Sequence, residues 1–139
     1  MIFVIVAIFI FKDIMQAAGV VDEMAAAAGG GAALFASAVF LPFFVGMVAG
    51  INVAFVGSTF PLLIGVLTML GMQAQLIPYL ILASFAGFTG VMVSPIHICF
   101  ILTCEFFGCD LARTWRKLVV PCMLLLLSGV GVFYFWLTR

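Results

Sequence analysis

The chain has 139 residues, of which 68% are hydrophobic and only 7% are charged, and its formal net charge is zero. Soluble domains carry about 25% charged residues, so this composition excludes a globular protein in water and predicts an all-α polytopic membrane protein. No Lys/Arg stripe indicates a nucleic-acid partner, and the four cysteines lack the spacing of a metal site. We therefore expect the lipid bilayer as a partner, no nucleic acid and no bound metal.

The first predicted element, residues 1–18, is the apolar stretch "MIFVIVAIFIFKDIMQAA". It predicts a transmembrane helix with Lys12 and Asp13 snorkelling near one end. Residues 20–31 follow, with an acidic pair, an alanine run and three glycines. This pattern predicts a short interfacial helix on the membrane surface and then a turn.

From Met24 to Cys104 the chain contains no Asp, Glu, Lys or Arg. At ~1.5 Å per helical residue, this stretch could cross a ~30 Å hydrocarbon core about four times. Residues 33–71 within it are interrupted by "GINVAFVGSTFP", which lacks the charge of an ordinary loop between two complete spans. Backbone can leave the helix at membrane depth only where protein or a cavity surrounds it, so we favour a re-entrant hairpin. After its tip, Ser58 or Thr59 stands in an N-cap position and Pro61 lies just inside the next helix.

Residues 76–107 exceed the ~20 needed for one crossing. Within them, "TGVMVSPIHIC" predicts a broken transmembrane helix that restarts with Ser94 as N-cap and Pro95 as first helical residue. Two helix N-termini with free N–H groups favour an anion site, and the carbonyls of the unwound residues can hold a cation. The alternative is that both motifs only kink helices, with hydroxyls bonding back into the ladder. His97, the single histidine, either packs or contacts substrate and exchanges a proton.

Small residues line the same region. Gly46 and Gly50 form a GxxxG pattern, and Ala83, Ala86, Gly87 and Gly90 follow in the next span. We expect these surfaces to let helices approach closely.

Residues 105–117 contain the basic segment "CDLARTWRK", and residues 118–138 predict the last transmembrane helix. Arg113, Arg116 and Lys117 place the 105–117 loop on the cytoplasmic side of the cell (inner) membrane. The C-terminus of this multi-pass protein is then expected outside.

The order of these elements, with "GSTFP" at the hairpin tip and "SPIH" in the broken span, resembles the C-terminal half of ion-transporter-superfamily carriers for gluconate, citrate and sodium–dicarboxylate. The stretch "FAGFTGVMVSPIHICFILTCEFF" more narrowly resembles an uncharacterised integral membrane family, the domain-of-unknown-function family four hundred and one. The resemblance implies one inverted-repeat half of a larger secondary transporter for a small organic anion. Transport would follow alternating access, with the site at the membrane centre, and would need a companion N-terminal half or a homodimer.

Carried over residue by residue, the resemblance implies two groups of substrate- or ion-binding residues. The hairpin tip would supply Asn52, Gly57, Ser58 and Thr59, and the unwound segment Thr89, Ser94, Pro95 and His97. The tip lacks the Ser-Asn-Thr run of the sodium–dicarboxylate branch, and the broken span has Ser-Pro-Ile-His instead of a double proline and Asn. The coupling ion, Na⁺ or H⁺, therefore stays open, and no other cofactor is expected.

Two other readings remain. The chain could be a non-transporting small membrane subunit or a truncated fragment of a split carrier gene. An intramembrane enzyme is disfavoured, because the charge-free stretch offers no carboxylate to orient His97 and a proline follows Ser94. We expect no enzymatic activity.

Overall fold

The computed structural model describes residues 31–138 continuously and, before them, only scattered positions between 3 and 26. The predicted helices at 1–18 and 20–31 lie outside the described residues, apart from Gly31, which begins the next helix. Helices follow one another along the described chain: α3 (Gly31–Ala49), α4 (Asn52–Met69), the 3₁₀ helix η1 (Gln73–Gln75), α5 (Leu76–Val93), α6 (Ile98–Phe106) and α7 (Leu111–Leu137). No strand occurs among residues 31–138, which confirms the all-α prediction.

Length and composition support a membrane location. Three helical segments are long and apolar enough to cross a bilayer: α4, the η1–α5 segment from Gln73 to Val93, and α7. The apolar part of α3, Ala33–Ala49, is slightly shorter.

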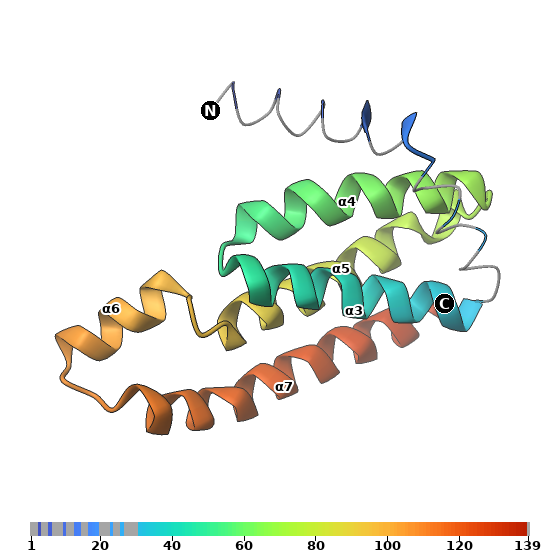
Figure 1. Ribbon diagram of the computed structural model, residues 1–139. Coiled ribbons are helices and arrows are strands. Elements are labelled where there is room, and N and C mark those ends of the chain that lie inside the picture. Colours follow the sequence, from blue (N-terminus) through green and yellow to red (C-terminus); the bar gives the residue numbers. More distant parts are fainter. Residues whose placement is uncertain are drawn as a thin grey trace.

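Helix α5 is the centre of the bundle, because α3, α4 and α7 all pack against it. Helices α3 and α4 form a helical hairpin, and α7 returns along the opposite side of α5 (Figure 1). Helix α6 projects beyond the end of this bundle at which α3 ends and α7 begins (Figure 1).

The largest hydrophobic core lies at the opposite end, where α4 gives way to α5. Phe133 of α7 is 3% exposed there, and its ring centroid lies 5.0 Å from that of Tyr79 and 5.4 Å from that of Phe35. Edge-on and tilted pairs of this kind add about 0.5–1.5 kcal/mol each beyond their area. They fasten the beginning of α3 and the beginning of α5 to the end of α7.

Between the two ends, glycines bring the helices into backbone contact, as the small-residue pattern predicts. A Cβ on Gly46 of α3 would lie 2.5 Å from the carbonyl oxygen of Gly87 on α5. One on Gly90 would overlap the backbone of Phe43, and one on Gly87 would overlap the ring of Phe55. Such gaps leave no room for a side chain, so α3, α4 and α5 form one tightly packed unit.

Two helix boundaries differ from the sequence-based expectation. The hairpin turns at Gly50–Ile51, so "GSTFP" is not its tip, and Ser58, Thr59 and Pro61 lie inside α4. Helix α7 begins at Leu111, so the basic residues expected in a loop form its first turns instead. The side chain of Asp110 caps this helix by accepting hydrogen bonds from Ala112 N at 2.9 Å and Arg113 N at 3.3 Å.

Candidate functional site

The hairpin turn is built on one glycine. Gly50 has φ +65° and its N–H donates to Gly46 O at 2.9 Å, which ends α3 in a left-handed residue. Ile51 is extended, with φ −134° and ψ 139°, and α4 begins directly after it at Asn52 without a side-chain cap. The first amide hydrogens of α4 therefore point out of this turn with no side chain to accept them.

The second interruption separates α5 from α6. Ser94 ends α5 with ψ 128°, an extended value that the following proline favours because its ring crowds the helical conformation of the preceding residue. The chain turns once, with His97 N donating to Ser94 O at 3.3 Å, and α6 begins at Ile98. The N-terminus of α6 also has no side-chain cap.

These two interruptions meet, and we call their contact the junction: residues Gly50–Ile51 against residues Ser94–His97. The Nδ1 atom of His97 lies 3.0 Å from Gly50 O. Because a carbonyl oxygen only accepts, Nδ1 must carry the hydrogen in this bond. A Cβ on Gly50 would lie 3.2 Å from Ser94 Oγ and 3.1 Å from Ile96 Cγ1, so the turn rests directly on the break.

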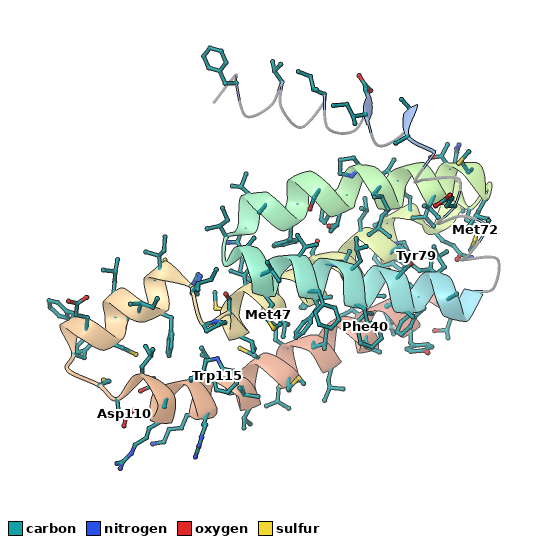
Figure 2. The ribbon with its side chains drawn as sticks, viewed as in Figure 1. Phe40, Met47, Met72, Tyr79, Asp110 and Trp115 are labelled. Atoms are coloured by element: carbon teal, nitrogen blue, oxygen red, sulfur yellow. The ribbon has the colours of Figure 1, made fainter. Side chains whose placement is uncertain are left out.

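Helix α7 supports the junction through Trp115. Its indole Nε1–H donates to Val93 O at 2.8 Å, which satisfies a carbonyl at the end of α5. Figure 2 shows Trp115 on α7 close to the connection between α5 and α6, and Asp110 at the outer end of α7. Two backbone carbonyls at the junction, Gly50 O and Val93 O, thus each accept a hydrogen bond from a ring N–H.

Hydroxyl groups behave in two ways around this region. Ser58 and Thr59 donate to the carbonyls of Ala54 and Phe55, and Thr89 donates to Phe85 O at 2.7 Å. These bonds run within the same helix. Ser94 is fully buried, but its Oγ only accepts a long 3.4 Å hydrogen bond from Ile96 N.

The N-cap assignments from the sequence are therefore wrong. Helix α4 starts at Asn52, about two turns or ~9 Å before Ser58 and Thr59. In apolar surroundings, a Ser or Thr hydroxyl can donate to a carbonyl of its own helix, and the helix then continues through that residue. This local bond outweighs the preference of Ser and Thr for the N-cap position. Ser94 ends α5 and does not start α6, and Pro95 precedes the first helical residue of α6 by three positions.

The structure brings only some predicted site residues together. Asn52, Ser94, Pro95 and His97 lie in or next to the junction. Gly57, Ser58, Thr59 and Thr89 lie within helices, away from the turn and the break. Sequence reasoning missed Gly50 and Trp115 as site residues. A glycine that follows a long apolar helix and precedes Asn is a helix-end pattern that points to Gly50, whereas no sequence pattern points to Trp115.

The junction has no charge of its own but adjoins a basic segment. Residues 31–104 contain no Asp, Glu, Lys or Arg, whereas Arg113, Arg116 and Lys117 flank Trp115. Arg113 also forms an exposed ion pair with Asp110, with Nε 3.6 Å from Oδ2. Since Trp115 bonds the last residue of α5, the junction lies at the basic end of a segment long enough to span a bilayer.

Chemically, the junction offers donors. Two helix starts without side-chain caps and one buried hydroxyl converge, and residues 31–104 contain no carboxylate. Amide hydrogens at the start of a helix are groups that can donate hydrogen bonds to an anion.

Comparison with known proteins gives one result. The family model described as "Protein of unknown function (DUF401)" matches residues 1–135. No curated protein and no solved structure gives a significant match. The matched range covers the hairpin, the junction and nearly all of α7.

Proposed function

We propose that this chain, which belongs to the DUF401 family, is half of a secondary transporter for a small organic anion. The observation that carries this proposal is the surplus of hydrogen-bond donors at the junction. Helices α4 and α6 both start there without a side-chain cap, whereas the start of α7 is capped by Asp110. Helix starts carry about half a positive charge each. A carboxylate bound between them would therefore accept hydrogen bonds from the amide groups that no side chain caps.

The same geometry favours an anion over a sodium ion. Sodium in a broken helix needs free carbonyl oxygens. At the junction, Gly50 O accepts from His97 and Val93 O accepts from Trp115, at 3.0 and 2.8 Å. Each of these oxygens already accepts one hydrogen bond, and residues 31–104 contain no carboxylate to balance a sodium ion, whereas a histidine such as His97 is a residue type that exchanges protons. We propose H⁺ as the coupling ion.

The basic residues at the start of α7 support recruitment of the substrate. Arg113, Arg116 and Lys117 lie within a turn of Trp115, whose indole contacts the break. Positive side chains that cluster at the entrance of a low-dielectric site raise the local concentration of an anionic ligand. In this proposal the segment is cytoplasmic, the C-terminus lies outside, and the protein sits in the inner membrane.

The remaining parts of the proposal concern topology and partners. We propose that the α3–α4 hairpin is re-entrant, with its Gly50 turn packed against protein. The burial of Gly50 supports this proposal. Helix α6 exposes apolar side chains, with Ile98 at 60% and Leu102 at 58%. A companion N-terminal half or a second copy would cover them and supply the second half-site that alternating access requires.

Trp115 allows a direct test of binding. The chain has two tryptophans, so Trp136→Phe leaves Trp115 as the only indole, already bonded at the junction. We expect gluconate, citrate or succinate to change the emission of this variant in a saturable way, and chloride at equal ionic strength not to. Uptake of the responding anion into vesicles that contain the protein with its companion should follow the same ranking.

The alternative, a small membrane subunit without a transport site, predicts a different result. Trp115 emission would then be indifferent to every anion tested, and Ser94 and His97 would tolerate Ala without loss of uptake. That outcome would refute the transporter proposal.

A further inference from the structure

One hydroxyl group in the described chain behaves unlike all the others. Every other serine and threonine between residues 31 and 138 donates its hydrogen to a carbonyl of its own helix or turn. The Ser94 hydroxyl donates to no atom among the described residues. It is nevertheless 0% exposed, so water is not in contact with it either. A buried donor without an acceptor is unfavourable and indicates a partner that this arrangement does not contain.

The Gly50 turn is what closes over this hydroxyl. The position of a Gly50 Cβ would be 3.2 Å from Ser94 Oγ, and the turn is held there by the His97 Nδ1–H bond to Gly50 O at 3.0 Å. The chain after Ser94 is more open: Ile96 is 54% exposed, Pro95 is exposed, and α6 beyond it projects from the bundle (Figure 1).

We propose that the Gly50 turn is a gate over Ser94, that the His97–Gly50 hydrogen bond keeps it shut, and that opening presents the Ser94 O–H to an oxygen of the bound anion. The second part rests on the proposed function; the gate itself does not. When the turn lifts, the Ser94 hydroxyl can donate beside the free amide hydrogens at the starts of α4 and α6. The structure is then the closed form, in which the Gly50 turn covers the Ser94 hydroxyl.

Thiol accessibility in membranes tests the gate. Ser94→Cys is introduced after Cys99, Cys104, Cys109 and Cys122 have been replaced by Ala, and its reaction with N-ethylmaleimide is timed. We expect slow labelling in this parent. His97→Ala should speed labelling about tenfold, the shift that losing one ordinary hydrogen bond produces in an equilibrium.

His97→Asn is the matched control. The amide nitrogen of Asn lies the same number of bonds from Cα as Nδ1 of His97, so it can donate to Gly50 O and should keep labelling slow. His97→Gln places its nitrogen where Nε2 was and should behave like Ala. Labelling that is fast in the parent, or equally slow in the Ala and Asn variants, overturns the gate. If the Ser94→Cys protein does not fold, hydrogen exchange at residues 94–98 is measured in the chain that keeps Ser94. His97→Ala should then speed exchange, and His97→Asn should leave it slow.

The ligand contact is tested separately. In the Trp136→Phe background, Ser94→Ala should weaken the anion response of Trp115 about tenfold while hydrogen exchange at residues 94–98 stays as in the parent. An unchanged affinity would overturn the role of Ser94 while the anion site itself stands. If no anion alters the parent, the proposed function fails, and the labelling result still shows whether the gate exists.

Discussion

Replacing Gly50 with Ala should measure how firmly the hairpin turn rests on the break. Gly50 has φ +65°, a conformation that costs an L-residue roughly 1–2 kcal/mol. The new Cβ would also lie 3.1 Å from Ile96 Cγ1, 3.2 Å from Ser94 Oγ and 3.3 Å from Ile96 O. Contacts this tight force the neighbours to move, which we estimate at a further ~1 kcal/mol. The expected loss of unfolding free energy is therefore about 2–3 kcal/mol.

Gly71 provides the matched control. Its φ is +69°, but a Cβ there would meet nothing within 4 Å, so Gly71→Ala carries the conformational cost alone, about 1–2 kcal/mol. Both variants are unfolded reversibly in mixed micelles by increasing SDS, with helix content followed by circular dichroism. The difference between them isolates the docking of Gly50 on residues 94–97. Equal losses would show that the turn does not rest on the break, and the junction would have to be abandoned.

Three further changes test the packing, the helix-bound hydroxyls and the support from α7. Gly90→Ala should cost ~3 kcal/mol in the same titration, because its Cβ overlaps the backbone of Phe43, whereas Gly131→Ala, with open space around it, should be neutral or stabilising by up to ~1 kcal/mol. Thr59→Val removes a hydroxyl that bonds only within its own helix, so we expect less than ~1 kcal/mol of change and an intact Trp115 response to anions; a lost response would return Thr59 to the binding site. Trp115→Phe removes the N–H that donates to Val93 O at the end of α5, so it should lower the unfolding free energy by ~1 kcal/mol and speed hydrogen exchange at residues 93–98. Exchange as slow as in the parent would show that Trp115 does not support the junction.

Composition and local chemistry predicted the class of protein and one of its two interruptions. The absence of charge in residues 31–104 favours helices that lie in a bilayer. The helix stops at Ser94-Pro95 because proline restricts the residue before it in any solvent. The close approach of the helices at Gly46, Gly87 and Gly90 is likewise predictable, because glycine has no side chain to hold them apart.

The position of the hairpin turn could not be obtained in the same way. Pro42, Pro61 and Pro121 all lie inside helices, so proline alone does not mark a break in this chain. A break persists where distant groups satisfy the backbone it frees. Here those groups are His97, 47 residues from Gly50, and Trp115, 22 residues from Val93. Neither pairing has a local sequence pattern, which is why the sequence could not separate the residues at the junction from the expected site residues that lie within α4 and α5.

The bonds that hold the junction together join rings to carbonyls and involve no pair of opposite charges. Ion pairs at a membrane surface weaken as dissolved electrolyte screens them, over a Debye length that falls to about 3 Å at 1 M. Dipolar bonds inside packed protein are largely spared this screening. This end of the protein should therefore keep its shape at high salt, and a competing hydrogen-bond partner is what would separate the turn from the break.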